Sequence, residues 1–318
     1  MSDDISYTTE EIAKLLKISK LTVYDLIKKG ELASYRVGKQ MRVDPIDLEA
    51  YKQRSKGIPM NEQPIKLESL TPTPTQPQAT NVGLRPLVIT GQDLVLDILA
   101  KYMETHMDGI RPLRAYVGSL DSLISMYRGE SDIVSTHLLD GDTGEYNLPY
   151  IRRILVGNSY IVVNLLSRNA GLYVKQGNPL SLKTWADLAT KGLRLSNREK
   201  GSGARVLLDE QLRLHGIKPD QLLGYNQVES NHLGVASKVA SGEADVGVGI
   251  EKAASIVGNI DFIPLIKENY DLVMLKTANN HIWIEPLLHI LRSDEFRKEL
   301  QSIAGYDLSR TGEILLET

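Results

Sequence analysis

The sequence predicts an α/β protein of more than one domain, with a small helical unit in front of a long body. Three observations carry this prediction. The chain has 318 residues, which is too long for one ordinary hydrophobic core. Hydrophobic residues make up 42% and charged residues 24% of it, as in packed globular proteins. From residue 87 onward, short apolar runs alternate with amphipathic helical patterns, which is typical of parallel sheets covered by helices on both faces.

Composition disfavours several classes of protein. The absence of cysteine removes disulfides and thiolate metal sites, and it suits a reducing compartment. No run of about 18 consecutive apolar residues occurs, so a membrane span is not expected. The opening MSDDISYTTEE lacks the basic start and apolar run of an export signal, so we expect a cytoplasmic chain. We expect neither a metal site nor a bound cofactor.

Residues 7–51 predict a compact helix-turn-helix unit. Ser6 or Thr8 caps a first, short helix, and Ser19 caps a second helix that ends at Gly30. Two short alternating runs then predict a hairpin or wing, and a proline opens a last helix. This order of elements predicts that the second helix is the one presented to a partner.

Positive charge is concentrated on the second helix and the hairpin. The net charge of the whole chain is only −3, yet between Lys20 and Arg42 six basic residues stand against two acidic ones. A helix fits the major groove of DNA, and a basic hairpin tip reaches the adjacent phosphates. The alternative is that these basic residues form the solvated face of a protein-binding helical domain.

Between Thr8 and Tyr51, the runs EEIAKLLKIS, TVYDLIKKGEL and YRVGKQMRV resemble the excisionase-type, MerR-like winged helix-turn-helix family. The resemblance implies double-stranded DNA as the partner. Because one short unit makes few base contacts, we expect a homodimer that reads two half-sites. The residues expected to contact DNA are Ser19, Lys20, Thr22, Tyr24, Lys28, Arg36, Lys39 and Arg42.

Composition changes again at residues 57–82, where prolines are interleaved with threonine and glutamine. Proline-rich segments are extended and semi-rigid. We therefore expect a DNA-binding domain at residues 1–56, a linker at 57–82 and a ligand-binding domain at 83–318.

In the body, each expected strand leads into small or polar residues that start the next helix. The strand at 86–90 is followed by Gly91-Gln92-Asp93, residues 115–117 by Gly118-Ser119, and residues 132–134 by Ser135-Thr136-His137. In an open parallel sheet, the carboxyl ends of the strands line a ligand crevice, and helix N-termini there offer free N–H groups. We therefore expect these turns to meet a small ligand.

A glycine-rich turn in the second half of the body is the clearest candidate for contact with an anion. Gly201-Ser202-Gly203 stands between an expected strand at 193–197 and an expected helix, so the main chain can approach a ligand closely. Arg198 or Arg205 would supply charge-assisted hydrogen bonds. The turn lacks the spacing and the final Lys-Ser/Thr of a P-loop, so nucleotide hydrolysis is not expected. Taken alone, such a turn is also typical of a simple helix cap.

Several ordered segments from Leu84 to about Ala278 resemble the periplasmic-binding-protein-like domain of bacterial and archaeal regulators, which is distantly similar to molybdate and tungstate receptors. They include GQDLVLDIL, NREKGSGARVLLDEQL and HLGVASKVASGEADVGVGIEKAA. The chain departs from the family at Gln92, where histidine is common, and at Ala204, where threonine is common. The ligand-binding residues so implied are Gly91, Gln92, Asp93, Gly118, Ser119, Thr136, His137, Arg198, Ser202, Gly203, Arg205, Asn231, His232 and Glu251.

Some of these residues have an alternative interpretation. Asp93 and Glu251 are also typical first-turn acids of helices, and His137 and His232 are also typical structural hydrogen-bonders. The resemblance further implies two lobes that close around a solute, one formed by residues 84–165 and 272–318 and the other by residues 168–270.

Together these features predict a two-lobed, periplasmic-binding-protein-like (type II) α/β domain behind a winged helix-turn-helix, and a ligand-responsive DNA-binding transcriptional regulator. An oxyanion such as molybdate or tungstate, or a metabolite related to the molybdenum cofactor, would bind between the lobes and modulate operator binding. No nucleophile elbow, HExxH motif or dinucleotide fingerprint occurs, so no catalytic residue is assigned. Two other classes of protein are alternatives. One is a cytosolic enzyme acting on a molybdopterin-pathway compound, and the other is a solute sensor whose N-terminal unit binds another protein.

Overall fold

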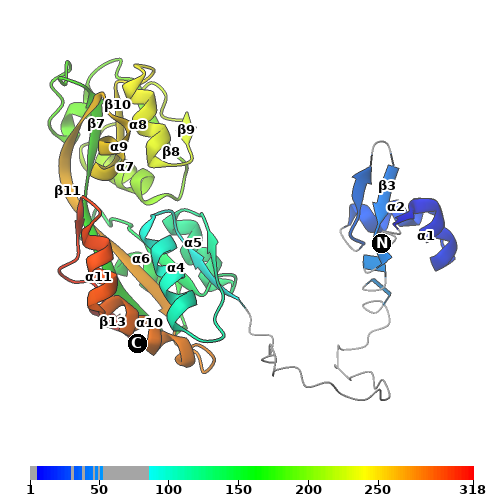
Figure 1. Ribbon diagram of the computed structural model, residues 1–318. Coiled ribbons are helices and arrows are strands. Elements are labelled where there is room, and N and C mark those ends of the chain that lie inside the picture. The colour runs from blue at the N-terminus through cyan, green and yellow to red at the C-terminus, as the bar shows by residue number, and fades with distance from the viewer. Residues whose placement is uncertain (1–5, 30–31, 38–39, 46, 49–50, 53–85) are drawn as a thin grey trace. The chain divides into compact units, whose positions relative to one another are not determined.

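The computed structural model describes residues 6–29, 32–37, 40–45, 47–48, 51–52 and 86–318 (Figure 1). The chain splits into two compact units between Pro77 and Gln78, and each is described by itself. The predicted linker at 57–82, and with it the boundaries at 56 and 83, lies outside the described residues.

The first unit, here called the head, is a helix-turn-helix with a small sheet. Its helices are α1 (Thr9–Leu16) and α2 (Lys20–Lys28), and its antiparallel strands, in the order β1-β3-β2, are β1 (Tyr7–Thr8), β2 (Tyr35–Val37) and β3 (Gln40–Val43). Thr8 caps α1 in a capping box with Glu11, and the Ser19 hydroxyl accepts the Thr22 N–H at the start of α2. A core holds the head together, formed by Ile12, Val23, Leu32, Val43 and Leu48.

The second unit, the body, is built on one large mixed sheet. Its strands, in the spatial order β5-β4-β6-β11-β7-β10-β8-β9, are β4 (Leu87–Thr90), β5 (Pro112–Ala115), β6 (Ile133–Thr136), β7 (Tyr160–Lys175), β8 (Leu195–Arg198), β9 (Val228–Glu229), β10 (Val246–Ile250) and β11 (Ile260–Leu275). Two further strands, β12 (Tyr306–Asp307) and β13 (Ile314–Glu317), pair with β7.

Helices cover this sheet on both faces. They are α4 (Val95–His106), α5 (Ser119–Tyr127), α6 (Leu148–Ile154), α7 (Gly203–Leu214), α8 (His232–Ala240), α9 (Glu251–Val257), α10 (His281–Arg292) and α11 (Asp294–Gln301), with short 3-10 turns η1 (Trp185–Ala189) and η2 (Pro219–Gln221). None of the helices in the described parts of the chain is long and apolar enough to cross a membrane.

The expectation of a parallel sheet is correct for the short strands and wrong for the two long ones. Strands β4, β5 and β6 are mutually parallel, as are β10, β8 and β9. The long strands β7 and β11 instead pair antiparallel over their whole length. The physical reason is connectivity: the chain leaves one half of the body along β7 and returns along β11, so the two crossings run in opposite directions.

These two strands join two lobes (Figure 1). The core of the first lobe includes β7 residues up to Leu166 and β11 residues from Tyr270, together with side chains of α4, α10 and α11. The core of the second lobe includes β7 residues from Ala170 and β11 residues up to Ile266, together with side chains of α7. The two apolar cores are largely distinct and touch where Leu139 joins the second core and Val206 of α7 packs on a cluster of the first lobe. Along β7 and β11, the chain crosses between the lobes near residues 167–169 and 267–269.

Candidate ligand site and nucleic-acid interface

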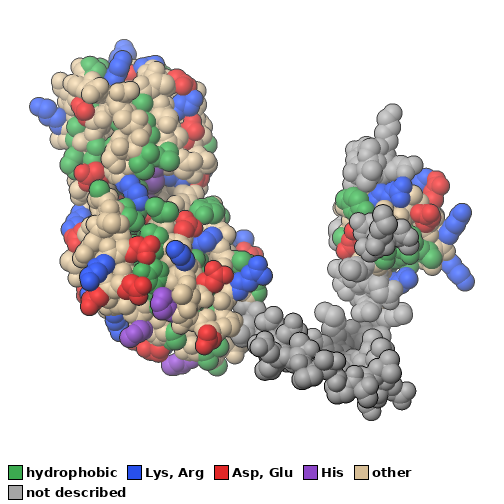
Figure 2. Space-filling model, viewed as in Figure 1, with side chains coloured by type: hydrophobic (Ala, Val, Ile, Leu, Met, Phe, Trp, Pro, Cys, Tyr) green, Lys and Arg blue, Asp and Glu red, His purple; other side chains and the backbone are tan. Residues whose placement is uncertain are grey.

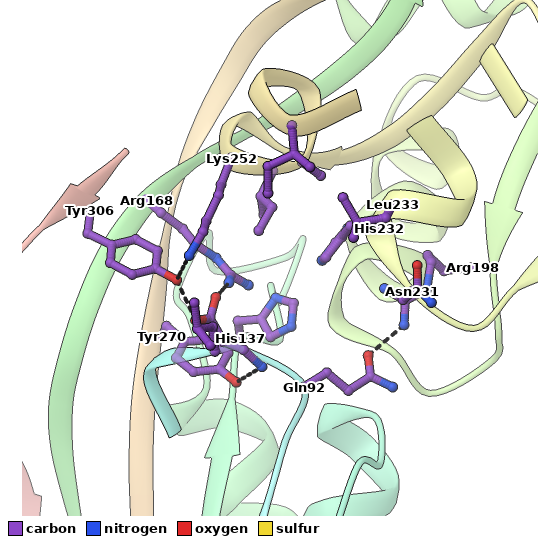
Figure 3. Close-up of a pocket in the computed structure, with 15 residues that line it drawn as sticks. Gln92, His137, Arg168, Arg198, Asn231, His232, Leu233, Lys252, Tyr270 and Tyr306 are labelled. Carbon is purple, nitrogen blue, oxygen red and sulfur yellow. Dashed lines mark hydrogen bonds and ion pairs between the residues drawn. The ribbon is translucent and has the colours of Figure 1, made fainter. Parts of the chain in front are cut away.

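A cavity of about 290 Å³ lies between the two lobes of the body. Its size is near the lower end of typical small-molecule sites. Figure 3 shows side chains from both lobes turned toward it, and in Figure 2 histidine and basic side chains are visible in the waist between the lobes. The lining residues are Gln92, Asp93, Leu94, His137, Arg168, Arg198, Asn231, His232, Leu233, Ile250, Lys252, Ala253, Ile256, Tyr270 and Tyr306.

Arg168 is the central buried charge of this wall. It lies on β7 with 4% of its side chain exposed; its Nη1 pairs with Asp93, and its Nε donates to Glu268 Oε1 at 2.6 Å. Its guanidinium also lies 4.6 Å from the centre of the Tyr270 ring. Burial alone would lower the pKa of Arg168, but the carboxylates of Glu268 and Asp93 raise it overall. The arginine is therefore held charged by two carboxylates.

Glu268 connects this arginine to His137. The Glu268 Oε2 lies 3.2 Å from His137 Nδ1, and the His137 ring also packs on the ring of Tyr270. Burial alone would raise the pKa of Glu268, but the charges and hydrogen bonds of His137 and Arg168 lower it overall. Glu268 and Tyr270 thus fix the position of the His137 imidazole.

Lys252, at the start of α9, is a cation of a different kind. Its Nζ donates to the Tyr306 hydroxyl at 3.3 Å and lies 4.9 Å from the centre of that ring, and no carboxylate of the described residues forms an ion pair with it. Burial lowers the pKa of Lys252. In Figure 3 its head group lies beside Arg168 and Tyr306 at one side of the cavity.

His232, at the start of α8, is neutral. Burial, followed by the charge of Arg198, holds its pKa well below the usual 6.5. Its Nδ1 is buried and has no hydrogen-bond partner among the described residues. An unsatisfied buried ring nitrogen is costly and uncommon in folded proteins.

The structure brings part of the predicted ligand-binding set to the cavity wall. These residues are Gln92, Asp93, His137, Arg198, Asn231 and His232. The remaining ones do not line it, and they are Gly91, Gly118, Ser119, Thr136, Ser202, Gly203, Arg205 and Glu251. The glycines of the predicted anion turn lie at a contact between the lobes, and most of the polar residues bond to other protein groups.

The predicted anion turn serves as a contact between the lobes. The Leu120 N–H donates to Gly201 O at 2.9 Å, and a Cβ on Gly118 would lie 2.9 Å from the same oxygen. A Cβ on Gly203 would lie 2.4 Å from the His137 ring. The glycines of this turn therefore permit close approach of one lobe to the other, and the cavity lies beside this contact.

The polar members of the set that lie off the wall have structural partners. The Ser202 hydroxyl accepts from Arg205 N at 3.3 Å as the cap of α7, and Arg205 donates to Asp209 and stacks on Tyr225. Ser119 accepts from the His137 N–H at 3.3 Å.

Two further members of the predicted set lie off the cavity wall, and Arg198 lies on it. Glu251 accepts from Asn169 Nδ2 at 2.9 Å. Thr136 is fully buried, and its Oγ1 has no partner among the described residues. Arg198 lines the cavity but is already engaged by Glu199 and by the Gln92 amide, to which its Nη2 donates at 2.6 Å.

Sequence reasoning missed four cavity residues that matter most. Arg168 and Tyr270 lie on the long strands, Lys252 lies at the start of α9, and Tyr306 lies on β12 near the C-terminus. An arginine inside the largely apolar run YIVVNLLSRNAGLYV was the signal that could have found Arg168, because charged residues are rarely buried without partners. Nothing local marks Tyr306, which reaches the site only through tertiary pairing of β12 with β7.

The head presents the expected face of α2. Ser19, Lys20, Thr22, Tyr24 and Lys28 are all exposed, and Lys20 Nζ pairs with Glu10 of α1. Leu21 was not predicted, yet it is 78% exposed on the same helix. Arg42 on β3 is partly buried, and its Nη1 donates to the Ser6 carbonyl at 3.1 Å, so it also holds the N-terminal strand in place. Arg36 lies on β2, and Lys39 lies outside the described residues.

No cluster of His, Asp or Glu in the described parts of the chain has the arrangement of a metal site.

These features define a class of protein: a helix-turn-helix head followed by a two-lobed, periplasmic-binding-protein-like body. The family model of the PBP superfamily domain matches residues 100–292, and that of a helix-turn-helix domain matches residues 6–56. The chain therefore belongs to the PBP superfamily-domain family, with a helix-turn-helix domain in front. Both resemblances seen in the sequence are confirmed.

Two relatives match the chain over different lengths. The chain is 49% identical over 319 residues to the uncharacterized protein YvgK of Bacillus subtilis (strain 168), covering 100% of both chains. It is 48% identical over 112 residues to an uncharacterized protein from the 5′ region of the ferredoxin 2Fe-2S gene of Clostridium pasteurianum, covering 35% of this chain and 99% of the relative.

Solved structures share the fold at low identity. A tungstate ABC transporter protein from Geobacter sulfurreducens matches with a TM-score of 0.51 and 13% identity, over 69% of this chain and 98% of that chain. An OxyR variant of Corynebacterium glutamicum matches with a TM-score of 0.51 and 13% identity, over 93% of this chain and 90% of that chain. At such identities, the likeness shows the fold alone.

Proposed function

We propose that this chain is a ligand-responsive transcriptional regulator, in which the head binds an operator and a small anionic solute binds between the lobes of the body. The observation that carries the proposal is the presence, in one chain, of an exposed polar recognition helix and an interlobe cavity lined by Lys252, His137 and His232. The function is one of binding, and as a DNA-bound regulator the protein would act in the cytoplasm.

Contacts across the two lobes support a closing motion. Beyond the Gly118–Gly201 contact, the Gly141 N–H donates to Glu210 Oε2 at 2.8 Å, and Gln92 bridges to Arg198 and Glu199. A solute that touches both lobes adds contacts only in the closed state, so it shifts the population toward closure. A coupling of about 1–3 kcal/mol is enough for a useful switch.

Several finer features belong to this proposal. Molybdate and tungstate, which the sequence resemblance implies, are the first inorganic ligands to test, and a metabolite related to the molybdenum cofactor is the organic counterpart. We also propose a homodimer that binds two half-sites, and lobe boundaries at residues 84–165 with 272–318 and at residues 168–270.

The test measures operator binding by the full chain. Fluorescence anisotropy with a labelled duplex from upstream of its own gene, at several salt concentrations, is expected to show binding that weakens with salt. Each ligand that calorimetry shows to bind is expected to change the duplex affinity by about 5-fold to 150-fold.

The double variant Lys20→Ala with Lys28→Ala is the control, because both residues lie on the head. It should lose duplex affinity and keep ligand affinity. Absence of duplex binding by the wild type would contradict the DNA-binding role. Duplex binding that no bound ligand alters would contradict the regulatory role.

A further inference from the structure

The charges around the cavity cancel. Three cations line it, Arg168, Arg198 and Lys252, and three carboxylates, Asp93, Glu199 and Glu268, pair with the two arginines. Arg168 faces two of these carboxylates, and Arg198 faces the third. Among the described lining residues only Lys252 is therefore a cation without an ion pair, which is too little positive charge to neutralise a buried dianion, and burying an unpaired charge is costly.

One cationic head group of the lining is left without an ion pair among the described residues. The nitrogen of Lys252 has the Tyr306 hydroxyl as its hydrogen-bond partner, and it faces the cavity. A lysine offers a single compact charge, in contrast to the fork of an arginine, so it suits one anionic group. The neutral His232, whose Nδ1 is unsatisfied, lies across the cavity from it.

Much of the rest of the wall is apolar. Ile250 and Ala253 form a buried surface beside Lys252, with 7% and 3% exposed. Three large apolar side chains that line the cavity also stay substantially exposed: Leu94 at 49%, Leu233 at 42% and Ile256 at 61%. A solute with its own apolar surface would cover them, and this gains free energy in proportion to the area removed from water.

The volume of the cavity also favours a solute with apolar surface. The cavity of about 290 Å³ has room for about ten water molecules at about 30 Å³ each. A tetrahedral oxyanion has no apolar surface and would leave the apolar side of the wall wet. An organic molecule of several carbon atoms would fill the space.

We propose that the cavity takes a compact organic monocarboxylate, with its carboxylate at Lys252 and its hydrocarbon body against Ile250, Ala253 and Ile256. The inference rests on the proposed function for its biological meaning, and it specifies the chemical class of the solute at that site. Gln92 and Asn231, on the far side in Figure 3, would accept or donate hydrogen bonds to a polar group at the other end of the molecule.

The test is a calorimetric titration of the full chain with straight-chain carboxylates from acetate to octanoate, with the matching alcohols, and with molybdate, tungstate, sulfate and phosphate. We expect carboxylate affinity to rise by about fourfold for each buried methylene until the cavity is full. Each alcohol should bind at least tenfold more weakly than the carboxylate of the same length, because it lacks the charge.

Three variants make the test specific. Lys252→Met keeps most of the unbranched side chain and removes the charge, so we expect it to lose carboxylate affinity by tenfold or more. Lys101→Met, on an exposed position of α4 outside the cavity, is the matched control and should bind as the wild type does. Ile256→Ser should flatten the dependence on chain length.

The outcomes separate this inference from the proposed function. Failure of the whole carboxylate series to bind would overturn the inference, as would unchanged affinity in Lys252→Met. If molybdate or tungstate binds more tightly than every carboxylate, the ligand class is wrong while a ligand-responsive regulator still stands. If carboxylates bind as expected but leave duplex affinity unchanged, the ligand class stands and the proposed function is wrong.

Discussion

Arg168 and Glu268 lie directly opposite each other on β7 and β11, the two strands that cross between the lobes, and their side chains form a buried ion pair. Arg168 also lines the cavity, and Glu268 holds His137, another lining residue. At the crossing point, one residue of the pair thus lies in the wall of the candidate site, and the other contacts a second wall residue. A change in the crossing strands therefore changes the site, which is what a hinged solute receptor requires.

Replacing Arg168 by methionine should destabilise the body strongly. Asp93 and Glu268 would be left buried without their cation, which costs about 3–5 kcal/mol of unfolding free energy. Chemical denaturation at pH 7 measures the loss. The exposed pair of Arg194 and Asp245 offers the control, since Arg194→Met should cost less than about 1 kcal/mol.

The loss of unfolding free energy in Arg168→Met should depend on pH. Arg168 lowers the pKa of Glu268, so the pair stabilises the fold above the unfolded-state pKa of that carboxyl and loses its effect as the pH falls. The deficit of Arg168→Met should therefore shrink toward low pH. A deficit that is the same at pH 4 and pH 7 would show that lost packing, and not lost charge, causes it.

Asp271 should give stability the opposite pH dependence. Burial raises its pKa from 3.8 to about 6, although the Asn147 and Asn164 amides, which donate to it at 2.6 and 2.8 Å, act to lower it. A raised carboxyl pKa stabilises the fold below 3.8, and this contribution is lost as the pH rises through about 6.

The measurement compares unfolding free energies of wild type and Asp271→Asn across this range. The advantage of the wild type over the variant should fall by up to about 3 kcal/mol as the pH rises. Asp142→Asn, whose native side chain is 79% exposed, should show no such trend. An advantage of the wild type that grows with pH would contradict the assignment.

Gly118→Ala should hinder closure without straining the backbone. The φ of Gly118 is −68°, which any residue adopts, but the added Cβ would lie 3.0 Å from Ser202 N and 2.9 Å from Gly201 O. Both are main-chain atoms of the opposite lobe and cannot simply rotate away. Small-angle scattering should show a larger radius of gyration than for the wild type.

The ligand affinity of Gly118→Ala should also fall, because the closed state of this variant would be less populated. Gln301→Ala, at an exposed position of α11, serves as the control. If Gly118→Ala scatters as the wild type does and binds equally well, this contact does not limit closure.

In the head, Lys28→Ala and Arg42→Ala should behave differently. Lys28 is exposed on α2, so its loss should weaken duplex binding for all sequences and reduce the salt slope by about 1. Arg42 also donates to the Ser6 carbonyl, so its variant should in addition lower the melting temperature of the head. Anisotropy and calorimetric melting of the full chain measure the two effects. Equal melting of both variants would show that the Arg42 contact contributes no stability.

Much of the local structure was predictable. Capping and short strands depend on residues close together in sequence. The structure has Ser19 as a cap and a strand at Leu87–Thr90, within the expected 86–90, and of the two expected candidates Ser6 and Thr8 it has Thr8 as the cap of α1. The antiparallel pairing of β7 with β11 was not predictable in this way, because an apolar strand looks alike in either direction. The role of Gly201-Ser202-Gly203 could not be decided from the sequence either. A helix cap, an anion site and a contact between lobes all need small residues with free N–H groups.

By itself, the sequence determined the two kinds of domain in this chain, the cap of each head helix and the alternation of strands and helices, because propensity, capping and hydrophobic period act over short separations along the chain. Only the tertiary structure decided which side chains meet. Asp93, Arg168, Glu268 and Tyr306 are far apart in sequence, and they converge because the two antiparallel crossing strands and the C-terminal β12 meet the turn after β4 that carries Asp93. Burial then forces their charges to pair, and among the described residues that line the cavity this leaves Lys252 as the cation without an ion pair.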